Sequence, residues 1–137
     1  MSVSEDLLTM EVPCNLRAPA TVRDALADVH DGAWSLDDGR LVASELVGNA
    51  VRHSGCRAEH HLKIAVCLRN ERLLISVHDP GLSGHAARPA GEDSLAPGGW
   101  GLRIVEELTE AWGTDRPNGY RVWAELAAHA NPQADAR

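Results

Sequence analysis

The sequence has 137 residues, enough for one domain that buries about two-thirds of the surface exposed by its unfolded chain. An apolar fraction of 44% and a charged fraction of 24% exclude wholesale disorder. The formal net charge of −7 argues against direct binding of nucleic acid or of an anionic membrane, although an acidic chain can still hold a local phosphate site.

The cysteines and the N-terminal segment bear on the cellular compartment. Cys14, Cys56 and Cys67 are an odd set without C-x-x-C spacing, which predicts neither a disulfide framework nor a zinc site and favours a reducing compartment. The first residues carry acidic groups where a secretory leader needs positive charge, and no apolar run is long enough to cross a bilayer. We therefore expect a cytoplasmic protein without a membrane association.

The N-terminal half predicts one strand, two helices and a hairpin, followed by a long loop. Alternating and apolar residues favour a strand at 7–16, and apolar spacings of three and four predict helices at 18–35 and 36–55. Two strand-like runs around "RNE" predict a hairpin within 61–81. The Gly-, Ala-, Pro- and Ser-rich stretch 82–98 is typical of a functional loop or lid, with a disordered insertion as the alternative.

The C-terminal part predicts a helix at 98–113 that begins with glycines, and a closing strand at 120–128. The order is therefore strand, helix, helix, hairpin, loop, helix and strand. This order predicts an α+β fold with helices on one face of a mixed, mostly antiparallel sheet. We expect a single domain over 1–137, with its core at about 7–127 and a flexible tail at 128–137.

A row of polar residues marks the second helix, in "SELVGNAVRHSG". Glu45, Asn49 and His53 are four residues apart and share one face, with Arg52 beside the end of the row. A carboxylate, an amide oxygen and an imidazole on one face suit a magnesium–triphosphate site. The same spacing is also typical of the solvent face of any amphipathic helix, and the helix alone leaves both interpretations open.

Two further motifs follow the hairpin and the long loop. Asp79 and Gly81 form D-x-G after a strand, where the carboxylate could accept from an exocyclic amine and the glycine could let a flat ring approach. Gly99 and Gly101 open a helix in "PGGWGL", where exposed backbone N–H groups favour phosphate. Each motif alone has low specificity, because such glycines also occur in ordinary turns and loop ends.

The motifs become informative as an ordered set. E-x-x-x-N-x-x-x-H on a helix, D-x-G after a strand, a long loop, and G-x-G-L into a helix resemble the ATP-binding domain of the GHKL superfamily. Within it, "LVASELVGNAVRHSG", "GGWGLRIVEEL" and "VWAEL" are most similar to the small anti-sigma-factor serine/threonine kinases of bacteria. The likeness covers about residues 7–127 and implies the two-layer α/β sandwich of the Bergerat ATP-binding fold.

The resemblance implies a role for each motif residue. Glu45 would be the general base, Asn49 would be the Mg²⁺ ligand, and Arg52 and His53 would lie near the phosphates of ATP. The loop at 82–98 would close over bound nucleotide as an ATP lid. The remaining motif residues would form the adenine site and the lid hinge: Asp79 accepting from the adenine amino group, Gly81 beneath the ring, and Gly99, Gly101 and Leu102 at the hinge and phosphate cradle.

The function implied is an ATP-dependent serine/threonine protein kinase that acts as an anti-sigma factor in partner switching. Such a protein sequesters a sigma factor, phosphorylates a small anti-sigma-factor antagonist and commonly forms a homodimer. The likeness departs at Arg121, which stands where members often have a Thr that helps to hold adenine. The alternatives are a nucleotide-binding module that sequesters a partner without phosphoryl transfer, a histidine-kinase catalytic domain, and a scaffold that binds no nucleotide.

Overall fold

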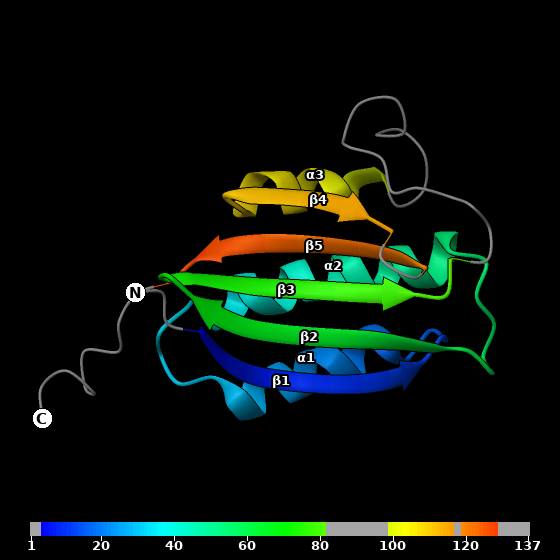
Figure 1. The fold of residues 1–137 in the computed structure, drawn as a ribbon, viewed down its shortest axis with the longest axis horizontal. Coiled ribbons are helices and arrows are strands. Elements are labelled where there is room, and N and C mark those ends of the chain that lie inside the picture. The colour runs from blue at the N-terminus through cyan, green and yellow to red at the C-terminus, as the bar shows by residue number, and fades with distance from the viewer. Residues whose placement is uncertain (1–3, 82–98, 117–118, 129–137) are drawn as a thin grey trace, which may run out of the picture.

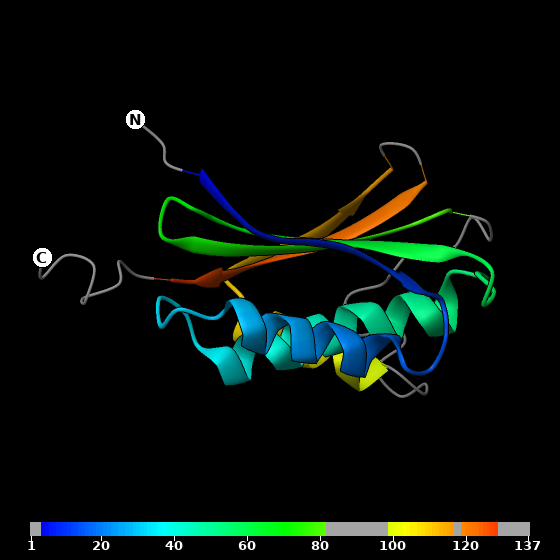
Figure 2. The same ribbon diagram turned by 90° about the horizontal axis from the view of Figure 1, so that it is seen from below.

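The computed structural model describes residues 4–81, 99–116 and 119–128, in which helices cover one face of a five-stranded sheet (Figures 1 and 2). The strand order is β1-β2-β3-β5-β4, and all four pairings are antiparallel. The predicted α+β, two-layer architecture is therefore confirmed. The elements are β1 (Ser4–Pro13), α1 (Ala18–Val29), α2 (Leu36–His53), β2 (His61–Arg69), β3 (Arg72–Asp79), α3 (Gly99–Leu108), β4 (Ala111–Asp115) and β5 (Tyr120–Ala127).

The core lies between the sheet and the helices. Successive side chains of a strand point to opposite faces, so every second residue of the central strands is buried. Fully burying one such aliphatic side chain stabilises the fold by about 1.5–3 kcal/mol, so this layer fixes the sheet register and holds the helices on one face. The largest fully buried side chains are Leu26, Leu46, Leu62, Ile64, Leu73, Ile75, Val12, Val22, Val42, Val47, Val66 and Val77.

The predicted hairpin is confirmed as β2 and β3, which are joined by a two-residue turn. Asn70 and Glu71 both have positive φ, 53° and 61°, and the flanking residues Arg69 and Arg72 pair directly. Positive φ at both central residues is the requirement of a type I′ turn, whose twist matches that of the strands. The turn thus aligns β3 so that its last residue, Asp79, lies on the helix face of the sheet.

The prediction of a continuous helix over 98–113 was wrong. The helix ends at Leu108, and Ala111–Asp115 forms the edge strand β4. The backbone N–H of Glu110 donates to the carbonyl of Glu125 at 2.8 Å, which begins the pairing with β5. Trp112 continues the helical spacing of the apolar residues before it, but strand pairing with β5 overrides this local pattern.

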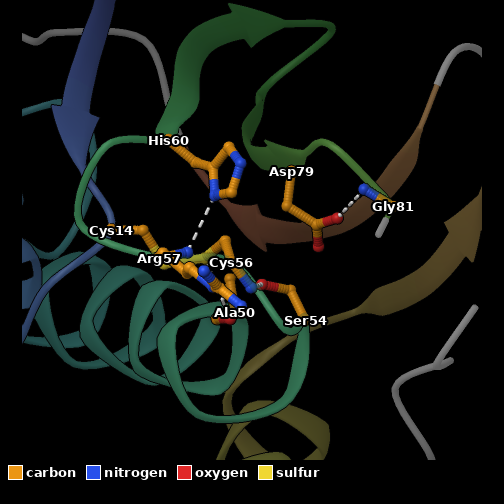
Figure 3. The surroundings of a disulfide bond; sticks show 8 residues. All are labelled: Cys14, Ala50, Ser54, Cys56, Arg57, His60, Asp79 and Gly81. Carbon is orange, nitrogen blue, oxygen red and sulfur yellow. Dashed lines mark hydrogen bonds between the residues drawn. A yellow bond between two sulfur atoms is a disulfide. The ribbon is translucent and has the colours of Figure 1, made fainter. Parts of the chain in front are cut away.

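The expectation that the cysteines form no disulfide was wrong for two of the three. Cys14, just after β1, and Cys56, just after α2, form a disulfide with their Cα atoms 6.2 Å apart (Figure 3). The two residues are 42 positions apart and meet only through the fold, so their spacing gave no sign of pairing. Cysteine usage therefore no longer supports a reducing compartment, and a cytoplasmic location stays a prediction. None of the described helices has the length and apolarity needed to span a bilayer.

Candidate functional site

Three segments that carry the motif residues meet at one end of the sheet. The C-terminal end of α2, the end of β3 and the first turn of α3 all lie on the right in Figure 1. Helix α2 packs against β3, β5 and α3. The fold thus brings together motifs that are spread over residues 45–102 of the sequence, as a shared site requires.

Helix α2 holds the polar row on a stable framework. The Ser35 hydroxyl caps its N-terminus by accepting from the N–H of Asp38 at 3.2 Å. Acidic residues lie in its first turn and basic residues in its last, which complements the helix dipole. Its C-terminal half, which carries Asn49, is therefore held in place by the capped helix and its packing partners.

Asn49 is the most deeply buried member of the polar row. Asn49 is only 6% exposed, and Glu45, one turn earlier, is half-buried. In the part of the chain that the structure describes, no side-chain hydrogen bond joins Asn49 or Glu45 to other residues. An amide oxygen and a carboxylate one helical turn apart suit a hard cation and a proton acceptor.

The last turn of α2 places its two basic side chains differently. Arg52 is exposed, and its side chain folds back along the helix toward Gly48. A Cβ added at Gly48 would lie only 3.1 Å from the Nη1 atom of Arg52. Gly48 thus makes room for the Arg52 guanidinium. His53 is half-buried at the helix end. His53 is therefore nearer to the protein interior, and Arg52 would have to leave Gly48 to reach a ligand.

Asp79 ends β3 as a buried carboxylate that organises the turn after the strand. It is 4% exposed, and its Oδ1 accepts from the N–H of Gly81 at 2.6 Å (Figure 3). Gly81 has φ +72°, and a Cβ there would lie 2.9 Å from the Cα of Gly119. The backbone of Gly119 therefore already demands a glycine at position 81, independently of any ring that approaches it.

The start of α3 supplies the third motif. The helix begins at Gly99, and Leu102 in its first turn is buried against Tyr120, with Trp112 packed beside them. The helix N-terminus carries a partial positive charge, which suits a phosphate. The predicted ATP lid, residues 82–98, lies outside the described residues, as does most of the predicted tail.

Strand β5 shows which residue truly neighbours Asp79, and sequence reasoning missed it. Asp79 pairs with Tyr120 across β3 and β5, and both are buried on the helix face. Arg121, the departure from the family pattern, lies on the opposite face and donates to both carboxylate oxygens of Asp115, at 2.9 and 2.5 Å. This contact lowers the pKa of Asp115. The alternation of buried residues along β5, continued back from Val122, is the signal that identifies Tyr120.

The donors present suit magnesium better than a transition metal. No group of three or more His, Cys, Asp or Glu side chains in the described ranges is placed to hold a metal ion. Mg²⁺ does not need such a cage, because it keeps waters and substrate phosphates in most of its coordination positions. A single amide oxygen, from Asn49, fits that requirement.

Comparison with protein families identifies the fold. The family described as the histidine kinase-like ATPase domain matches residues 12–126, which span every described element except the first part of β1 and the last residue of β5. No curated protein matches the chain. The matched region contains all the motif residues on α2, β3 and α3.

Proposed function

Because the chain belongs to the histidine kinase-like ATPase family, we propose that it is a protein serine/threonine kinase that uses ATP and Mg²⁺. The observation that carries the proposal is the burial of Asn49, near the C-terminal end of α2, and of Asp79, at the end of β3. Only three polar or charged residues are buried in the described part of the chain, and these are two of them. Such groups are unfavourable in a core unless they serve a partner or a ligand.

The nucleotide would lie between α2, the end of β3 and the start of α3. Asn49 would hold Mg²⁺, which neutralises phosphate charge when bound. Asp79 would accept a hydrogen bond from the adenine amino group, while its Oδ1 keeps the turn to Gly81 in shape. Gly99, Gly101 and Leu102 would position the phosphates at the helix N-terminus, with His53 near their charge.

The phosphoryl transfer requires a base beside the metal site, and we assign this role to Glu45 on α2. Glu45 lies one helical turn before Asn49 and is half-buried. It would take the proton of a serine or threonine hydroxyl as that oxygen bonds to the γ-phosphorus. The bond from the γ-phosphorus to the bridging oxygen breaks, ADP leaves, and the substrate becomes a phosphoserine or phosphothreonine.

The biological role that fits this chemistry is that of an anti-sigma factor in partner switching. The motif likeness to anti-sigma-factor kinases supports this proposal, with a sigma factor and an antagonist protein as partners and a homodimer as the working form. Phosphate adds up to about two negative charges to the antagonist, which can break an interface. Release of the phosphorylated antagonist would return the kinase to its sigma factor.

The position of Arg121 bears on the rival proposal of a binding module without phosphoryl transfer. That rival was suggested in part by a bulky cation at the place of the family's Thr. Arg121 instead lies on the outer face of the sheet, paired with Asp115. The Arg121 cation therefore does not lie on the face of the sheet that carries Asp79.

The test is phosphoryl transfer to a small anti-sigma-factor antagonist protein, chosen from the products of neighbouring genes. The protein, Mg²⁺, γ-labelled ATP and the antagonist are incubated, and label on serine or threonine is measured. The kinase proposal predicts transfer by wild type and its loss in Glu45→Gln. Intact binding of the antagonist without any transferred label would overturn the kinase proposal in favour of the binding module.

A further inference from the structure

Tyr120, the first residue of β5, lies beside the candidate site but belongs to none of the three motifs. It belongs to the alternating set of β5 residues that face the helices, and it is 4% exposed. It pairs directly with Asp79 across the two strands. Side chains that pair in this way have Cβ atoms about 4.5–5.5 Å apart, so the ring of Tyr120 begins beside the Asp79 carboxylate.

The other side of the ring contacts the start of α3. Tyr120 and Leu102 form a small buried cluster of their own, separate from the main core, with Trp112 packed on it. The guanidinium of Arg116 lies over the ring, 5.1 Å from its centroid. Tyr120 therefore links the buried carboxylate at the end of β3 to the helix that bears the glycine motif.

We propose that Tyr120 is a positioning residue for the nucleotide base. Its ring forms an apolar wall next to Asp79, and a hydrogen bond to a carboxylate is stronger where water is excluded. Its contact with Leu102 holds α3 at a fixed place relative to that carboxylate. The proposal rests on ATP binding, the first half of the proposed function, and is independent of phosphoryl transfer.

The affinities for ATP and ITP can be compared within one protein, and a general loss of structure would weaken both without changing their ratio. ATP carries an exocyclic amino donor, whereas ITP carries an oxygen at the same place and would face the Asp79 carboxylate with an acceptor. A lost hydrogen bond to a charged group weakens binding about tenfold or more. The ratio of the dissociation constants for ITP and ATP thus reports how well the base is held against Asp79.

The experiment is calorimetric titration of the whole protein with Mg-ATP and Mg-ITP. Wild type should prefer ATP by about tenfold or more, and Tyr120→Ala should lose most of that preference. Tyr120→Phe keeps the ring and should keep the preference. Arg121→Ala is the matched control, since it alters the next residue on the opposite face of the same strand and should leave the ratio unchanged.

Several outcomes would overturn the inference. These are an unchanged ITP-to-ATP ratio in folded Tyr120→Ala, an equal loss of preference in Arg121→Ala, or no preference in wild type. If Tyr120→Ala fails to fold, by circular dichroism, Tyr120→Thr replaces it, because threonine suits a strand but removes most of the apolar wall, and it should likewise lose most of the preference. Wild type that prefers ATP but transfers no phosphate would contradict the kinase proposal and leave this inference standing.

Discussion

The backbones of Gly81 and Gly119 lie so close together that neither position has room for a Cβ atom. A Cβ at Gly81 would come within 2.9 Å of the Gly119 Cα, and a Cβ at Gly119 would overlap the carbonyl oxygen of Asp79. Both residues have positive φ, +72° and +115°. The end of β3 is therefore locked against the start of β5, and this lock fixes the backbone of Asp79.

Gly81→Ala should destabilise the protein by more than its backbone conformation alone requires. We expect the free energy of unfolding to fall by about 2–4 kcal/mol, from the positive φ plus the contact with Gly119. Gly32→Ala is the matched control, because Gly32 has φ +94° but nothing within 4 Å of its Cβ position. That control should lose only about 1–2 kcal/mol. Equal losses in urea denaturation would show that Gly119 exerts no steric constraint.

Replacement by alanine should change the free energy of unfolding differently at two glycines of α2, Gly39 and Gly48. A Cβ at Gly39 would lie 2.6 Å from the ring of Trp34, which is fully buried and cannot move aside. Gly39→Ala should therefore lower the free energy of unfolding by about 1–3 kcal/mol. Trp34 thus belongs to the hydrophobic core.

At Gly48 the neighbour is the mobile end of the exposed Arg52 side chain, which can shift. Gly48→Ala should thus be neutral or stabilise by about 0.5–1 kcal/mol, from reduced backbone entropy in the unfolded chain. Thermal or urea unfolding of the two variants side by side checks the pair. A loss at Gly48 as large as that at Gly39 would contradict the described packing.

The Cys14–Cys56 disulfide should contribute substantially to stability. Closing a loop between residues 42 positions apart corresponds to about 4 kcal/mol in the chain-entropy model. Cys56→Ser should lose this amount, whereas Cys67→Ser should not, since Cys67 is the free cysteine. Thiol titration of the denatured, unreduced protein should find one thiol, because two of the three cysteines are paired. Three titratable thiols would contradict the pairing.

Glu45→Gln separates the base from the binding groups. The amide keeps the size of the side chain but cannot accept the hydroxyl proton, so phosphoryl transfer should fall about 10²–10⁴-fold. ATP affinity should change little, because Asn49 and Asp79 remain in place. The rate of phosphoryl transfer under saturating ATP tests the first expectation. The ATP affinity, measured by calorimetry, tests the second. Unchanged transfer would remove Glu45 from the proposed mechanism.

The sequence predicted most of the fold because its periodicities are strong and local. The alternation in β2, β3 and β5 and the apolar stripes of α1 and α2 reflect burial on one face, which the residue order records directly. The edge strand β4 escaped prediction because Trp112 also fits a helical spacing. Only pairing with β5, a contact distant in the sequence, makes that segment a strand.

The candidate site was predictable in its motifs and not in its tertiary contacts. Asn49 and Asp79 lie in local patterns, and the structure places both as buried polar groups. The sequence does not show which distant segments meet in space. It therefore could not predict the pairing of Tyr120 with Asp79, the contact between Gly81 and Gly119, or the disulfide. Arg121 stands where members of the family often have a Thr that helps to hold adenine, and strand alternation turns it to the outer face.

The most direct test of the central claim is calorimetric titration of Mg-ATP into wild type and Asp79→Asn. Asparagine keeps a carbonyl oxygen for the N–H of Gly81 but replaces the other oxygen with a donor that cannot accept from adenine. The account predicts Mg²⁺-dependent binding by wild type and about tenfold or greater weakening in the variant. Absence of ATP binding by wild type, or equal affinity in the two proteins, would contradict it.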